Sequence, residues 1–197
     1  MVSRRWRGRW LLLIGGGALL LGTASWAEGA VARARARSLW EEREARRAVA
    51  LARASVERPT REGAPAIGAP VARLLIPAIG LDEVVVEGVG SRELNAGPGH
   101  LPRTPLPGEA GNAAVSAHRD RHFARLGALR VGDVVTTETE RRRTQWEVVS
   151  TRIVDADEPA IFPSAEPMLT LTTCWPIRWF GPAPQRLVVT AKPTAPR

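Results

Sequence analysis

The clearest sign of the fold is the stretch LTLTTCWPIRWFGPAPQRLVVTAK, from Leu169 to Lys192. Two runs rich in threonine, leucine and valine flank a loop that holds three aromatic residues and three prolines. Alternating β-branched residues favour strands, and proline and glycine between two such runs favour a turn. The stretch therefore predicts two antiparallel strands joined by a loop whose tip lies near Phe180.

Short runs of the same kind recur from about Val71 to the C-terminus. Seven or eight such strands within about 125 residues predict a mainly β fold, either a closed barrel or a sandwich. One short helical turn is expected around RHFARLGAL, residues 121–129. Besides the two strands above, the runs are VARLLIPAI (71–79), EVVVEG (83–88), NAAVSAH (112–118), DVVTTETE (133–140) and TQWEVVSTRIV (144–154).

The positive charge of the chain is concentrated in its N-terminal part. The net charge is +8, but residues 63–197 carry 15 Lys+Arg against 14 Asp+Glu, whereas residues 1–62 carry 13 Arg and 6 Glu. The β-rich part is therefore almost neutral. We expect no nucleic-acid partner, because phosphate contacts need clustered cations.

An uncharged segment, WLLLIGGGALLLGTASWA, runs from Trp10 to Ala27 behind four arginines. Eighteen helical residues span about 27 Å, close to the thickness of the bilayer hydrocarbon. Residues 1–27 are thus predicted to be a basic N-terminus and a transmembrane signal-anchor. The arginines favour a cytoplasmic N-terminus, which places the rest on the extracytoplasmic or periplasmic side of the cell (inner) membrane. A cleaved signal peptide ending at Ser25-Trp26-Ala27 is the alternative.

The next segment, residues 28–70, is predicted to connect the anchor to the β-rich domain. Residues 31–57 are rich in Ala, Arg and Glu, a composition that favours a helix, and Glu42 and Arg46 form an i,i+4 pair. The apolar residues make no wide stripe, so we expect a solvated juxtamembrane stalk. Residues 58–70 form a Pro/Gly linker. The catalytic or binding domain is expected over residues 71–197.

The chain has one cysteine, Cys174, at the end of a predicted strand. Exported proteins that use cysteine for stability normally carry an even number, so an unpaired thiol suggests chemistry; a small buried apolar residue is the alternative. His118 also ends a predicted strand. A thiol attacks as the thiolate, and an imidazole can take its proton and later deliver it to a leaving amine.

Arg186 is the third candidate, because Cys174 and Arg186 each lie six residues from Phe180. In a hairpin with its tip at Phe180 they face each other, with Cβ atoms about 5 Å apart. A guanidinium presents fixed donors to the oxyanion of acyl transfer. An ordinary surface arginine on a strand is the alternative.

These residues carry a resemblance to a known family. TLTTC at 170–174 with PQR at 184–186 resembles the TLxTC…R signature of sortases, and Gly97–Asp120 resembles the segment of those enzymes that ends in a catalytic histidine. The loop CWPIRWFGPAPQR is most similar to class D sortases and the related sortases of Gram-negative bacteria. The resemblance covers roughly residues 70–192.

The resemblance implies an eight-stranded barrel with one or two short helices and a membrane-anchored cysteine transpeptidase. Such an enzyme cleaves an LPxTG-like C-terminal sorting signal after Thr and transfers the acyl group to an amine. Cys174 would be the nucleophile, His118 the general acid/base and Arg186 the stabiliser of the oxyanion or substrate. No cofactor or metal is expected, since the acidic turn at 155–158 has too few ligands for Ca²⁺. A hydrolytic thiol endopeptidase and an inactive anchored binding module are the alternatives.

Four further residues are expected to bind substrate. The resemblance favours Thr173 on the pocket wall, and Ala117 stands where relatives commonly have glycine, so its methyl group would narrow the approach to His118. Trp175 and Trp179 would form a wall for an apolar peptide, or else pack under the loop.

The two remaining histidines are not expected to be catalytic. His100 is expected to hold a loop near the site by hydrogen bonds. His122 is expected to be solvated on the short helical turn.

Overall fold

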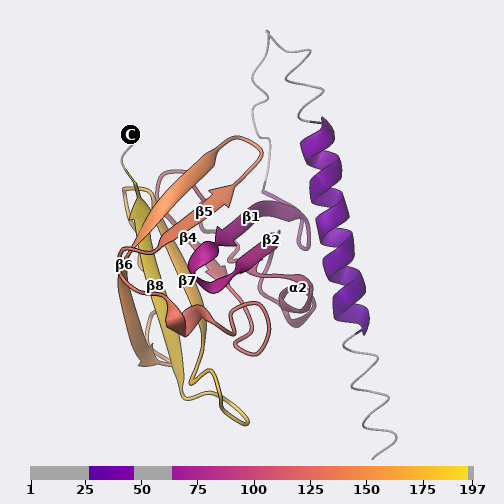
Figure 1. The fold of residues 1–197 in the computed structure, drawn as a ribbon. Coiled ribbons are helices and arrows are strands. Elements are labelled where there is room, and N and C mark those ends of the chain that lie inside the picture. The colour runs from indigo at the N-terminus through magenta and orange to yellow at the C-terminus, as the bar shows by residue number, and fades with distance from the viewer. Residues whose placement is uncertain (1–26, 47–63, 195–197) are drawn as a thin grey trace, which may run out of the picture.

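The computed structural model describes residues 27–46 and 64–194. These residues form eight strands, which wrap into a barrel beside a long N-terminal helix (Figure 1). The short helices are α2 and two 3-10 turns, η1 and η2, and all bounds are as follows: β1 Pro70–Ile76, η1 Pro77–Ile79, β2 Leu81–Glu87, α2 Ser91–Ala96, β3 Gly99–His100, β4 Asn112–Ser116, η2 Leu126–Ala128, β5 Val134–Glu138, β6 Arg143–Asp155, β7 Met168–Trp175 and β8 Gln185–Pro193.

The barrel is closed, with the strand order β1-β2-β3-β4-β7-β8-β6-β5. Antiparallel pairing of β1 with β5, for example Leu74 with Thr137, closes it. Two neighbouring pairs are parallel, β2 with β3 and β4 with β7. The predicted eight-stranded barrel is confirmed, and the sandwich is excluded.

The sequence patterns missed three elements, β3, α2 and η1. β3 has only two residues, too few to show alternation. Its first residue, Gly99, lies so close to β2 that a Cβ there would overlap the carbonyl oxygen of Gly88. A glycine at this position permits that close approach, and it also hides the strand from propensity arguments.

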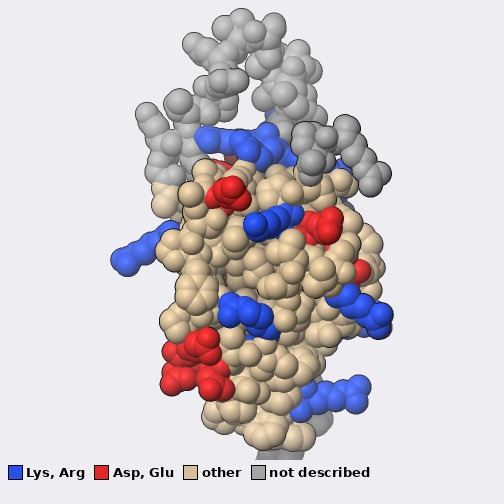
Figure 2. Space-filling model, turned by 90° about the vertical axis from the view of Figure 1, so that its left-hand side faces the viewer, with Lys and Arg blue, Asp and Glu red and all other residues tan. Residues whose placement is uncertain are grey.

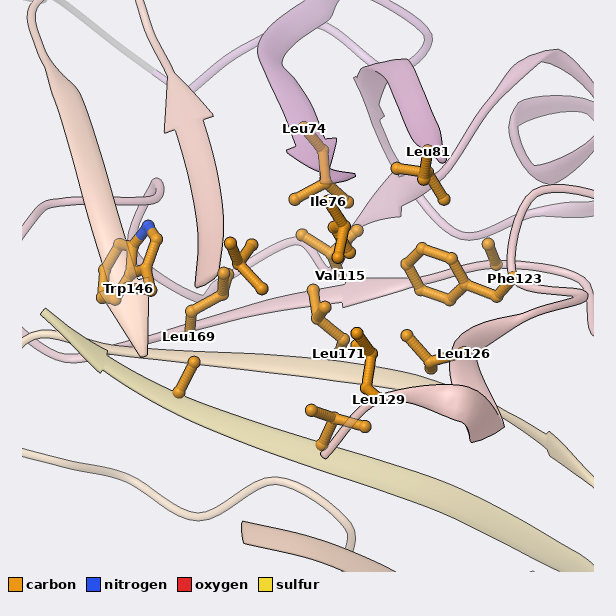
Figure 3. Close-up of a cluster of buried hydrophobic side chains, with 14 of the residues drawn as sticks. Leu74, Ile76, Leu81, Val115, Phe123, Leu126, Leu129, Trp146, Leu169 and Leu171 are labelled. Carbon is orange, nitrogen blue, oxygen red and sulfur yellow. The ribbon is translucent and has the colours of Figure 1, made fainter. Parts of the chain in front are cut away.

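The barrel interior is a continuous apolar core, part of which Figure 3 shows. Side chains from opposite strands meet there, among them Leu74, Trp146 and Leu171, all fully buried. Each such side chain contributes about 1.5–3 kcal/mol through burial. Trp146 buries its ring and still donates a hydrogen bond of 2.8 Å from Nε1 to Oγ1 of Thr137. Phe123, from the segment after His118, closes this core from one side (Figure 3).

Residues 27–46 are helical, as predicted for the stalk, but the helix is not solvated on all sides. Ala36 and Trp40 are buried against Val84 and Val86 on the outer side of β2. Arg43 donates to the carbonyl of Pro70 and pairs with Glu140 at 3.3 Å. The expectation of a solvated stalk was wrong because two apolar residues spaced i,i+4 are enough to dock a helix.

The predicted transmembrane anchor, Trp10 to Ala27, lies outside the described residues except for its last residue. Most of the Pro/Gly linker also lies outside them, so both remain predictions. Of the helices within residues 27–46 and 64–194, none is long and apolar enough to cross a bilayer.

Charged side chains of both signs occur on the face of the molecule that Figure 2 shows. On the face shown in Figure 2, basic and acidic groups are scattered over an otherwise uncharged surface. This distribution agrees with the near-neutral charge of residues 63–197.

Candidate active site

The site is built on β7 and β8, which pair antiparallel as the sequence predicted. Cys174 is the register partner of Arg186, and the two strands remain paired back to Leu169 and Ala191. Cross-strand partners of this kind have Cβ atoms about 4.5–5.5 Å apart. The hairpin therefore sets a thiol beside a guanidinium at the start of the β7–β8 loop.

Cys174, His118 and Arg186 line one cavity of about 550 Å³. They come from three segments: the end of β7, the residues that follow β4, and the start of β8. The parallel pairing of β4 with β7 brings the first two together, since Ser116 is the register partner of Thr172. The cavity is lined by Val89, Leu94, Leu101, Ala114, Val115, Ser116, Ala117, His118, Ala156, Glu158, Ala160, Ile161, Thr172, Cys174 and Arg186.

The floor of this cavity is the outer face of the barrel. Side chains alternate along a strand, so Thr172 and Cys174 share one face while Leu171 and Thr173 share the other. Leu171 is fully buried in the core, which identifies the inner face. Cys174 is unpaired and exposed, so its sulfur is accessible to a peptide in the cavity. The alternative of an inert buried cysteine is excluded.

His118 is half-buried at the cavity edge. Burial lowers the pKa of its imidazole below the usual value, the Asp120 carboxylate acts in the opposite direction, and the charges of Arg121 and His122 lower the pKa further. A lowered pKa keeps the ring neutral at pH 7. A neutral imidazole is the form that accepts a proton from a thiol.

The guanidinium of Arg186, at the start of β8, is oriented by a hydrogen bond to the residue that follows β6. Its Nε donates a 3.2 Å hydrogen bond to the carbonyl of Ala156, the first residue after β6. This bond holds the guanidinium between the β6–β7 connection and Cys174. The remaining N–H groups of a guanidinium form a rigid fork suited to an oxyanion.

Thr173 does not line the cavity, contrary to the expectation from resemblance. Strand alternation turns it inward, where it is 1% exposed and its hydroxyl donates a 2.7 Å hydrogen bond to the carbonyl of Ala117. The backbone N–H of Ala117 in turn donates to the carbonyl of Thr172. Thr173, directly before Cys174, is thus bonded to Ala117, directly before His118. Ala117 lies on the cavity wall, and its contact with a substrate stays a prediction.

Trp175 and Trp179 do not line the cavity either. Trp175 lies on the inner face of β7 and packs against the barrel core. Its ring also contacts η2, because a Cβ at Gly127 would lie 3.0 Å from Cζ3. Trp179 is half-exposed in the β7–β8 loop, where its Nε1 donates to the carbonyl of Pro182. Trp175 therefore packs against the core under the loop, the second of the two interpretations, and contact of either tryptophan with a peptide stays a prediction.

The two other histidines behave differently from each other. His100 is buried, with Nδ1 2.7 Å from a carboxylate oxygen of Glu87 and Nε2 donating to the carbonyl of Pro105 at 2.9 Å. It holds the loop after β3 as expected. The expectation for His122 was wrong: it is 8% exposed, and its Nδ1 lies 3.3 Å from Glu83.

Sequence reasoning missed two parts of the cavity. Thr172 is on the wall, and its position two residues before Cys174 on one strand was the signal that could have identified it. The second part is the β6–β7 connection, which contributes Ala156 and Ile161. Nothing in its composition indicates that it folds over β4 and β7.

Comparison with known proteins agrees with this arrangement. Residues 74–194, more than half of the chain, match the Sortase domain family. The chain therefore belongs to the sortase family.

Sortase D of a bacterium is among the curated relatives of this chain. The chain is 36% identical over 121 residues to Sortase D of Bacillus subtilis, a match that covers 60% of this chain and 61% of that protein. The chain thus spans about 61% of the length of this curated relative.

Solved structures show the same fold. A Clostridium perfringens sortase D5 transpeptidase aligns with a TM-score of 0.65 at 22% identity, covering 84% of this chain and 99% of that one. The catalytic domain of SrtD from B. anthracis aligns with a TM-score of 0.57 at 31% identity, covering 72% and 97% respectively.

Proposed function

We propose that this chain is a cysteine transpeptidase that cleaves an LPxTG-like sorting signal after Thr and transfers the new acyl group to an amine. The observation that carries the proposal is the shared cavity of Cys174, His118 and Arg186. Membership of the sortase family supports the same reaction class. The cavity lies on the outer face of the barrel, where an extended peptide has access to the thiol.

The chemistry follows from the three side chains. His118 takes the proton of the Cys174 thiol, and the sulfur attacks the carbonyl carbon of the substrate Thr. Arg186 stabilises the negative oxygen of the tetrahedral intermediate. Collapse of the intermediate breaks the peptide bond, and His118 gives its proton to the departing amine. This leaves a thioester on Cys174.

The second half of the reaction reverses these roles. An acceptor amine attacks the thioester carbonyl, His118 takes its excess proton, and the thiol leaves as the new amide bond forms. Water in place of the amine would give simple hydrolysis. The acceptor decides whether the product is joined or released.

Anchoring belongs to the same proposal. Residues 10–27 would hold the enzyme in the cell membrane, with residues 28–197 on its extracytoplasmic or periplasmic side. The support for this is the uncharged run behind four arginines.

The test is incubation of the full chain with a library of LPxT-containing peptides, with and without an added amine. Mass spectrometry of the protein should show an acyl adduct on Cys174, and the peptide products should contain the added amine. The control is the same chain with His118→Ala, which should form little adduct. Hydrolysed peptide alone under all conditions would show an endopeptidase, and no adduct with any peptide would contradict the proposal.

A further inference from the structure

The tip of the β7–β8 loop, residues 178–182, presents two aromatic side chains to solvent. Phe180 is fully exposed and Trp179 is 50% exposed, although large aromatic side chains are normally buried. Neither lines the catalytic cavity. Exposed aromatic residues on a protruding loop indicate a contact surface. We call this segment the loop tip.

Three backbone carbonyls of the loop tip accept hydrogen bonds from side chains. Nη2 of Arg119 donates to the carbonyls of Trp179 and Gly181, at 3.0 and 2.9 Å. Nε1 of Trp179 donates to the carbonyl of Pro182 at 3.0 Å, and a proline has no N–H to satisfy. A backbone carbonyl without a donor is costly away from water. The tip therefore tolerates removal from water better than an ordinary solvated turn does.

The charged residue within the loop tip, Arg178, and the one bound to it, Arg119, are both basic, while the acidic turn at 155–158 adjoins the base of the loop at Pro184. The sequence from residue 167 to residue 197 contains no Asp or Glu, and Arg178 lies beside the two aromatic residues. Arg119 contributes a second positive charge at the same place. A pair of aromatic side chains flanked by arginines fits the interface of a bilayer that carries anionic headgroups.

The loop tip lies at the end of the molecule where the N-terminal helix begins. A Cβ at Gly29 would lie 3.1 Å from Nη1 of Arg121, two residues from the arginine that binds the tip. At the other end of the helix, Arg43 pairs with Glu140 in the β5–β6 turn. Figure 1 shows the β7–β8 loop at the bottom and the β5–β6 hairpin at the top.

We propose that the loop tip docks on the surface of the lipid bilayer in which the N-terminal segment is anchored. The first described residue of the helix, Ala27, is also the last residue of the uncharged run, so the run joins the helix at the loop-tip end. The mouth of the Cys174 cavity then opens at the bilayer surface. A substrate whose C-terminal apolar segment lies in the same bilayer presents its cleavage site there. This inference rests on the proposed function and names the surface on which the enzyme acts.

The first test measures depth and needs no catalysis. The full chain with Cys174→Ala and Phe180→Cys carries an environment-sensitive fluorophore and is reconstituted in phosphatidylethanolamine–phosphatidylglycerol vesicles. Nitroxide-labelled lipids should quench this fluorophore several-fold more than one attached through Phe162→Cys. Phe162 is a matched control: it is 51% exposed, and its carbonyl is bound by Asn112 at the far end of β4 from His118. Equal quenching at both positions would overturn the docking proposal.

The second test compares two substrates in the same vesicles. One is a soluble LPxTG peptide, and the other carries the same signal followed by an apolar helix in the bilayer. Phe180→Ser should slow turnover of the embedded substrate about tenfold, the expected loss when one large apolar contact disappears, and leave the soluble peptide unaffected. Phe162→Ser should change neither rate.

The outcomes separate the two proposals. If Phe180→Ser slows the soluble peptide equally, the tip contacts the peptide and not the bilayer. If it changes neither rate, docking on the bilayer is likewise rejected. Inactivity of the unsubstituted chain on both substrates would contradict the proposed function, while the depth measurement would still decide the position of the tip.

Discussion

The inner face of β7 contributes to the stability of the barrel, and its outer face contributes to the active site, although residues of the two faces alternate along one strand. The inner face carries Leu169 and Leu171, both fully buried in the barrel core. The outer face carries Thr172 and Cys174 on the cavity wall. Stability and chemistry are therefore separated by the direction of a side chain and not by distance along the chain. Substitutions on the two faces should have separable effects.

Cys174→Ala should give the largest effect, confined to the outer face. We expect transpeptidation to fall by at least about 1000-fold, because the group that forms the thioester is gone. The midpoint of thermal unfolding should stay unchanged, since the exposed thiol has no packing partner to lose. Peptide assays and circular dichroism measure both quantities. A large drop in unfolding temperature would show that Cys174 is part of the core.

Leu171→Ala should have the opposite profile. The cavity left in the barrel core should lower the free energy of unfolding by about 2–5 kcal/mol. Denaturant titration measures this loss. The folded fraction should keep its specific activity per active site, counted by thiol labelling of Cys174. Loss of activity in fully folded Leu171→Ala protein would contradict the idea that the two faces of β7 act independently.

Thr173→Val tests the link between the faces. The valine keeps the shape but leaves the carbonyl of Ala117 without its side-chain donor, which should cost about 1–2 kcal/mol of stability. It should also lower kcat more than it raises KM, because it loosens His118 relative to Cys174 and does not touch the peptide. Thr173→Ser keeps the hydroxyl and is the matched control. Equal effects of Val and Ser would assign the role to packing.

The smallest effect concerns pH. The pKa of His118 is lowered in the folded state, chiefly by burial, so between that pKa and the ordinary value the unfolded chain binds more protons. His118 should therefore make stability rise with pH through this window and fall as the solution is acidified. His118→Gln should remove this component, measured as the difference between the two stability curves from pH 5 to 8. Parallel curves would contradict the lowered pKa.

The sequence was sufficient where local patterns set the structure. Cys174 and Arg186 are equally distant from Phe180 in a hairpin, so their register followed from counting. The strand-end position of His118 was also predictable. Its proximity to Cys174 was not, because it depends on the parallel pairing of β4 with β7, between segments more than 50 residues apart. Such pairing leaves no local pattern.

Two assignments at the site had a common origin. Thr173 and Trp175 were assigned to the substrate from resemblance and from neighbourhood to Cys174, whereas alternation along β7 directs both of them inward. The same alternation would have selected Thr172. The docking of Trp40 on β2 was missed for another reason: one tryptophan in a polar helix leaves a weak pattern, and only the facing strand shows that the side chain is buried.

Closure of the sheet has a consequence for recognition. The pairing of β1 with β5 closes the sheet, so no strand of the described barrel is an edge strand over its full length. Many proteins hold an extended peptide by adding it as a further strand, so that main-chain hydrogen bonds supply affinity for almost any sequence. A closed barrel offers little opportunity for such main-chain hydrogen bonding to an added strand. A peptide at Cys174 must be held by side chains and loop atoms, and selectivity for particular residues is then a condition of binding at all.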